Sequence, residues 1–243
     1  MNLLGHFVCA GHLSPEARLG AVLPDLVSLY RRRVRARQLV RLWTPPPPGA
    51  PRGTDGLLAG VAFHHHVDRL FHSHPAFETA TAGLQAALRA ASGAPGLKRF
   101  FPAHLLTEMY LDRLLMERRP ARVDAFYAEV AAAGEAPGAP FVLRHPLAER
   151  AGWGAFLERF TAQRFLEDYL SDAGLVHRMN RVLVRMRQRA LLPAEEVAAT
   201  DFLAGQRAAL GGFLAEFVPR MRTWHPPPEG GAWRATAAGP GRL

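Results

Sequence analysis

The sequence contains very little cysteine and has no long apolar run. Cys9 is the single cysteine, which excludes an intramolecular disulfide and any cysteine-rich zinc module, and which is typical of a reducing cytoplasm. A membrane-spanning helix needs roughly 18 consecutive apolar residues. Because no such run is present, we expect no membrane partner, and because no basic flank precedes an apolar stretch at the N-terminus, we expect no signal peptide. These absences predict a cytoplasmic protein.

Several catalytic motifs are also absent. The chain has no GxSxG nucleophile elbow, no P-loop and no GxGxxG segment, and nothing beside Cys9 indicates a reactive thiol. The alternating pattern of β-strands is nearly absent, which predicts an all-α protein. The chemistry that the remaining residue types favour is activation of water by a metal ion.

The composition predicts one folded domain with a tail. The chain has 243 residues, of which 49% are hydrophobic, so we expect a single helical domain over residues 1–221. Residues 222–243 are expected to form a disordered tail, because proline and glycine are frequent from Pro226 onward. Loops are expected at 44–53, 92–96 and 134–140. Helices are expected over 15–43, 55–71, 76–91, 101–117, 122–133, 154–171, 175–190 and 194–217.

The positive charge is carried almost entirely by arginine. The net charge is +9, and Lys98 is the only lysine. A run of arginines follows the first long apolar segment, and its members proposed to bind a partner are Arg31, Arg32, Arg33 and Arg35. Such a run favours an acidic protein surface, a nucleic acid or phosphates, whereas a GC-rich genome or a solvated helix face explains it without any partner. No aromatic residues are interleaved with the arginines as in a base-stacking platform, so we do not expect a nucleic-acid partner.

Histidines and acids recur at helical spacing in two segments. His64, Asp68 and His72 lie at i, i+4 and i+8, and therefore on one face of a helix. Glu108 and Asp112 repeat this spacing in an apolar helix, with His104 one turn earlier. An imidazole and a carboxylate one turn apart can bind the same metal ion. The alternative is that both sets are solvated polar patches.

Two further candidates lie near the N-terminus. His6 falls within an apolar segment that should pack inside the protein, where it is either a ligand or a core histidine bonded to backbone. Asp25 is a single acid in the apolar run 20–27, and it is either a ligand or, since Pro24 precedes it, a turn cap.

These segments occur in the order of motifs found in a known family. Met1–His6 (MNLLGH) is similar to an MNxLAH opening, and residues 20–27 (GAVLPDLV) to a GNLLADFV-like stretch. Residues 60–68 (GVAFHHHVD) and 71–75 (FHSHP) match GIxxHRxID and TDxHP, residues 108–115 (EMYLDRLL) match DVxxDHFL, and residues 213–221 (FLAEFVPRM) match FxxFYPxM. Over residues 1–221 the chain resembles the acyl carrier protein phosphodiesterases, helical relatives of the HD-type metal phosphohydrolases.

The resemblance implies a fold, a reaction and a set of residues. It implies an HD-like helical bundle that hydrolyses the 4'-phosphopantetheine phosphodiester of holo-acyl carrier protein, or a related phosphodiester, with a divalent metal that is usually manganese. Acyl carrier proteins are acidic, which gives the arginine run a partner. The implied metal ligands are His6, Asp25, His64, Asp112 and His72; the implied catalytic residues are Asp68, Asp112 and Glu108; and the positions expected to contact phosphate are His65 and Arg113.

The chain departs from the family pattern at four positions near the implied site. Ala21 replaces an asparagine, His65 an arginine, His72 an aspartate and Arg113 a histidine. These changes support an alternative function, in which a catalytically weakened relative serves as a basic helical binding module for an acidic partner.

Overall fold

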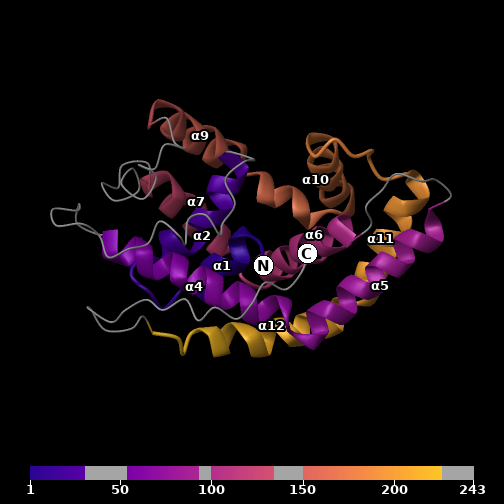
Figure 1. The fold of residues 1–243 in the computed structure, drawn as a ribbon, viewed down its shortest axis with the longest axis horizontal. Coiled ribbons are helices and arrows are strands. Elements are labelled where there is room, and N and C mark those ends of the chain that lie inside the picture. Colours follow the sequence, from indigo (N-terminus) through magenta and orange to yellow (C-terminus); the bar gives the residue numbers. More distant parts are fainter. Residues whose placement is uncertain (31–53, 93–99, 134–149, 226–243) are drawn as a thin grey trace.

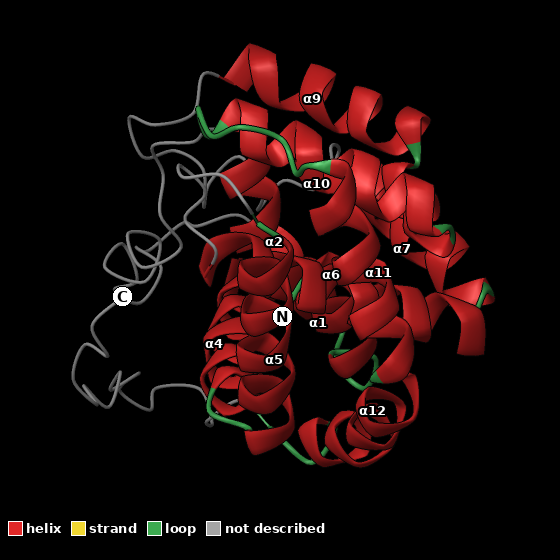
Figure 2. Ribbon diagram, turned by 90° about the vertical axis from the view of Figure 1, so that its right-hand side faces the viewer, coloured by secondary structure: helices red, strands yellow, loops and turns green. Residues whose placement is uncertain are grey.

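The computed structural model describes residues 1–30, 54–92, 100–133 and 150–225. These residues form helices and no strand, which confirms the all-α prediction (Figure 2). None of the described helices is both long enough and apolar enough to cross a membrane. The α-helices are α1 (Leu3–Cys9), α2 (Pro15–Tyr30), α4 (Thr54–His72), α5 (Pro75–Ala91), α6 (Phe100–Arg118), α7 (Ala121–Ala133), α9 (Arg150–Gln163), α10 (Asp172–Arg185), α11 (Pro193–Gly205) and α12 (Arg207–Met221), and η1 (Phe165–Leu170) is a 3-10 helix (Figure 1).

The helices from α4 to α7 lie close to the ranges that the sequence predicts, whereas the later ones differ. The helix expected over 154–171 is interrupted at Arg164, whose φ of 41° places it in the left-handed region. The Tyr127 hydroxyl accepts the Leu166 N–H at 3.0 Å and so caps the new turn from another helix. The helix expected to reach residue 190 ends at Arg185, and the one expected over 194–217 is divided at Gln206 into α11 and α12.

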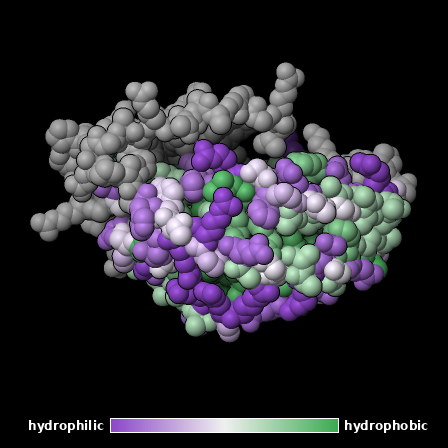
Figure 3. Space-filling view, turned by 90° about the horizontal axis from the view of Figure 1, so that it is seen from below, coloured by the Kyte–Doolittle hydropathy of each residue, from purple (hydrophilic) through white to green (hydrophobic). Residues whose placement is uncertain are grey.

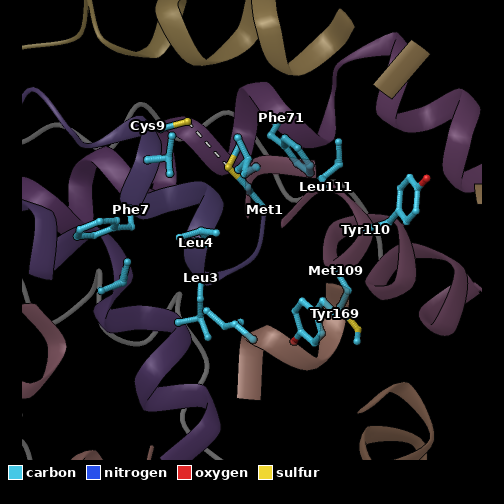
Figure 4. Packing of buried hydrophobic residues seen from close by; sticks show 14 of the residues in the cluster. Met1, Leu3, Leu4, Phe7, Cys9, Phe71, Met109, Tyr110, Leu111 and Tyr169 are labelled. Atoms are coloured by element: carbon cyan, nitrogen blue, oxygen red, sulfur yellow. Dashed lines mark hydrogen bonds between the residues drawn. The ribbon is translucent and has the colours of Figure 1, made fainter. Parts of the chain in front are cut away.

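Helix α1 forms the centre of the apolar core. Every residue from Leu3 to Cys9 is buried, and the helix contacts α2, α4, α6, α7 and α12. Phe7 packs edge-on against Phe126 of α7, and Figure 4 shows Leu3, Leu4 and Met1 among apolar side chains of other helices. A short helix that is apolar on all sides is stable only when other elements surround it. His6 is thereby carried into the middle of the protein.

Helices α2 and α4 pack at very short range because each presents a glycine to the other. A Cβ on Gly20 would lie 2.1 Å from the Leu57 carbonyl oxygen, and a Cβ on Gly60 would lie 2.0 Å from the Ala17 carbonyl oxygen. Only glycine permits two backbones to approach so closely. This packing brings Asp25 of α2 next to His64 of α4.

The end of the described chain packs against α4. Trp224 lies 5.2 Å from Phe63 between ring centroids, and the Trp224 carbonyl oxygen is 2.7 Å from His12 Nε2. The domain boundary predicted at residue 221 is therefore followed by a short packed segment, while 226–243 lie outside the described residues. On the face in Figure 3, hydrophilic side chains are spread among apolar ones, as is usual for a protein surface.

Candidate metal centre

The first candidate group joins three helices. His6 of α1, Asp25 of α2 and His64 of α4 each offer one ligand atom, and these atoms all lie within 4.8 Å of one another. Asp25 lies inside α2, with its carboxylate 2.9 Å from His6 Nδ1, so it is not a turn cap. Three of the residues predicted as ligands are thus brought together from distant parts of the sequence.

His6 is held between two carboxylates. Its Nδ1 lies 2.9 Å from Asp25 Oδ2, and its Nε2 lies 3.1 Å from Asp68 Oδ1. Burial disfavours the charged form, but Asp25 and Asp68 outweigh burial and raise the pKa of His6 to about 9. The buried imidazole is therefore doubly protonated at neutral pH and donates to both acids, rather than bonding to backbone as the core-histidine alternative proposed.

His64 has one nitrogen fixed and the other directed at an acid. Its Nδ1 donates to the Ala21 carbonyl oxygen at 2.9 Å, so that nitrogen carries a hydrogen. Burial, together with the neighbouring His6, lowers the pKa of His64 to about 4, and the ring is neutral at pH 7. The Nε2 lone pair therefore faces Asp68 Oδ2 at 3.5 Å, an arrangement in which two acceptors oppose each other.

The second group joins α4, about two turns beyond His64, to α6. His72, His104 and Glu108 also have ligand atoms within 4.8 Å of one another. Glu108 Oε1 lies 2.9 Å from His72 Nε2 and 3.2 Å from His104 Nε2. The side chains are partly accessible, at 34% for His72, 26% for His104 and 11% for Glu108. Solvent can therefore reach this group.

A positive charge lies between the two groups. The α-amino group of Met1 is 2.9 Å from Asp68 Oδ1 and 3.0 Å from Glu108 Oε1. Burial would lower the pKa of this amine, but the two carboxylates raise it to about 11. Its charge in turn holds the pKa values of Asp68 and Glu108 well below their usual range, against the effect of burial. Both carboxylates are thus ionised, as metal binding requires.

Asp112 has a different position from the one predicted. Its Oδ1 accepts the Gly5 N–H at 2.9 Å and its Oδ2 accepts the Leu4 N–H at 3.3 Å. It lies outside both candidate groups, so the structure assigns it to the N-terminus of α1 in place of the predicted ligand and catalytic roles. Burial raises the pKa of Asp112 to about 7, although the two backbone N–H groups favour its charged form.

The predicted phosphate contacts separate in the structure. The guanidinium of Arg113 pairs with Glu117 and Asp172, so it is engaged on the α10 side and not at either metal group. His65 follows His64 with ring centroids 5.1 Å apart, and its buried Nε2 has no hydrogen-bond partner among the described residues. The phosphate contacts of His65 and Arg113 stay predictions, and the structure places these two side chains apart. The predicted partner-binding residues Arg31, Arg32, Arg33 and Arg35 lie outside the described residues.

The sequence prediction did not assign a role to His104 or to the Ala21 carbonyl. The i, i+4 spacing of His104 and Glu108 was a usable signal for the first. No signal was available for the second, because a backbone carbonyl has no residue signature. Comparisons with protein-family models, curated proteins and solved structures find no match to this chain.

Proposed function

We propose that this protein is a metal-dependent phosphodiesterase, and that its substrate is the 4'-phosphopantetheine phosphodiester of holo-acyl carrier protein or a related phosphodiester. The proposal combines the motif order in the sequence with the grouping of His6, Asp25 and His64 around Asp68. The cation that the family resemblance implies is Mn²⁺.

The observation that carries the proposal is the opposition of His64 and Asp68. A carbonyl oxygen can only accept, so Ala21 fixes the hydrogen of His64 on Nδ1 and leaves the Nε2 lone pair toward Asp68 Oδ2 at 3.5 Å. Two acceptors this close are unfavourable unless a cation or a proton lies between them. A divalent cation fits the requirement, and the Nδ1–H bond to a backbone carbonyl is the usual support of a metal-ligating histidine.

The residues of the chain have separable tasks in this proposal. Asp25 and Asp68 orient the His6 ring, and Asp112 positions α1, which carries His6. Asp68, which is ionised and has 29% of its side chain accessible, is the candidate general base. A divalent cation at this site would activate water and offset charge on the phosphoryl oxygens.

The test is incubation of the purified protein with holo-acyl carrier protein and Mn²⁺, followed by intact-mass spectrometry. We expect loss of the 4'-phosphopantetheine group and recovery of the apo carrier protein. His64→Ala should reduce the rate by about 100-fold or more, since it removes a ligand and not merely a supporting group. His177→Ala is the matched control, because His177 is exposed on α10. Absence of hydrolysis of both holo-acyl carrier protein and bis(p-nitrophenyl) phosphate would contradict the proposal.

The alternative is a basic binding module for an acidic partner, with weakened catalysis. The observation that favours it is the engagement of Arg113, at a motif position, with Glu117 and Asp172. It predicts salt-sensitive binding of the acyl carrier protein with no change in its mass.

A further inference from the structure

We propose that His72, His104 and Glu108 form a second cation site with zinc-type ligands, separate from the group around His6. Two imidazoles and one carboxylate are the ligand set of many catalytic zinc sites, in which a fourth position stays open. His104 and Glu108 lie one turn apart on α6, and His72 reaches them from the last turn of α4.

The hydrogen-bonding arithmetic at Glu108 argues against a purely structural cluster. Three nitrogens lie within bonding distance of the single oxygen Oε1, namely His72 Nε2 at 2.9 Å, the Met1 amine at 3.0 Å and His104 Nε2 at 3.2 Å. A carboxylate oxygen has two lone pairs, so it cannot satisfy three donors well. If His72 Nε2 or His104 Nε2 carries no hydrogen, its lone pair points at Glu108 Oε1. A metal ion between the nitrogen and the oxygen would bind both.

The surroundings of His72 fit the role of a ligand. When Nε2 binds a metal, the ring hydrogen is on Nδ1, and this atom lies 4.0 Å from Asp68 Oδ1. This separation is too long for a hydrogen bond, so Asp68 acts on the ring of His72 through its charge. The rings of His72 and His104 lie 4.8 Å apart between centroids and are tilted by 31°, so neither ring blocks the other.

Asp68 connects this site to the first group. Its Oδ1 lies 3.1 Å from His6 Nε2 and 2.9 Å from the Met1 amine, which itself lies 3.3 Å from His72 Nε2. The Met1 ammonium already lies between the carboxylates of Asp68 and Glu108, so a cation at the second group has to bind Glu108 in place of this ammonium or beside it. Binding of an ion to the second group does not depend on the proposed reaction. A second ion could also hold the phosphodiester beside an ion at the first group, and that role rests on the proposed function.

The test is equilibrium dialysis of the metal-free full-length protein against Zn²⁺, with bound zinc measured by elemental analysis. We expect two ions per chain for the wild type and for the His177→Ala control. His104→Ala should retain one ion, and so should His64→Ala, because each substitution removes a ligand of a different site. The double variant should retain none.

His104→Gln keeps a hydrogen-bond donor toward Glu108 while removing a good zinc ligand, so it separates loss of metal from loss of fold. Circular dichroism should show the helix content of the wild type, with zinc affinity at the second site reduced by about 100-fold or more. Zinc binding by the wild type that His104→Ala leaves unchanged overturns the proposal, and so does a His104→Gln variant that binds as much zinc as the wild type with unchanged affinity. Neither result depends on hydrolysis of a phosphodiester, so failure here is distinct from failure of the proposed function.

Discussion

At the residue scale, the chemistry of each acid follows from what it faces. Asp68 faces cationic and neutral nitrogens, and Asp112 faces backbone N–H groups at the start of α1. Both belong to i, i+4 patterns with a histidine or an acid, and the sequence therefore gave them the same candidate role. The difference arises because Asp112 is directed at a helix N-terminus, where a carboxylate stabilises orphan N–H groups.

A substitution separates these roles for Asp112. Asp112→Ala leaves two buried N–H groups without acceptors, and we expect it to lower the free energy of unfolding by about 2–4 kcal/mol. Asp112→Asn keeps an amide oxygen as an acceptor and should cost less. Urea unfolding measures both effects, and dialysis against Zn²⁺ should show the wild-type metal content in Asp112→Asn. Loss of metal from a folded Asp112→Asn variant would instead identify Asp112 as a ligand.

At the element scale, the packing of α2 on α4 depends on glycines. Gly20 and Gly60 allow the two helices to approach so closely that each candidate Cβ would collide with a backbone oxygen. Backbone atoms within a packed helix cannot move aside as a flexible side chain can. The distance between Asp25 and His64 is therefore set by two residues that take no part in the chemistry.

Gly60→Ala tests this contact. The added methyl group would lie 2.0 Å from the Ala17 carbonyl oxygen, and we expect a loss of about 3 kcal/mol or more in the free energy of unfolding. Gly212→Ala is the matched control in α12, since a Cβ there meets no atom within 4 Å. Because alanine favours a helix over glycine, that variant should gain about 0.5–1 kcal/mol. Equal urea midpoints for the two variants would contradict the close packing.

At the scale of the whole molecule, stability depends on a buried network of opposite charges. The folded protein holds a proton on His6 up to about pH 9, whereas the ordinary pKa is 6.5. Folded protein therefore binds more protons than unfolded protein between these values. The stabilisation from this group is complete below pH 6.5 and is lost as the pH rises through about 9.

The metal-free protein should accordingly lose stability on the alkaline side. With a chelator present, we expect His6 alone to lower the free energy of unfolding by on the order of 3 kcal/mol between about pH 6.5 and pH 9.5, and the Met1 amine, whose pKa is raised from 8.0 to about 11, to add to the loss above about pH 8. His6→Gln should flatten the slope between about pH 6.5 and pH 8, whatever its effect on stability at pH 7, while His177→Gln should leave it unchanged. Urea unfolding at several pH values measures the slope, and a wild-type slope that persists in His6→Gln would contradict the assignment.

The sequence by itself determined the helical class and most of the helix positions. Helical spacing placed His64, Asp68 and His72 on one face, because a helix repeats every 3.6 residues regardless of its surroundings. The proline and acid at the start of α2 indicated its first residue in the same local way. These features depend on neighbours in the chain and need no knowledge of the fold.

Only the tertiary structure decided which polar groups meet. His6 reaches Asp25 and Asp68 because α1 is inserted among five helices. The turn at Arg164 forms where the Tyr127 hydroxyl of α7 accepts the Leu166 N–H, and no glycine or proline in the sequence indicates it. Contacts of this kind join residues far apart in the chain, and their free energy comes from burial and from charges that only the folded state brings within a few ångströms.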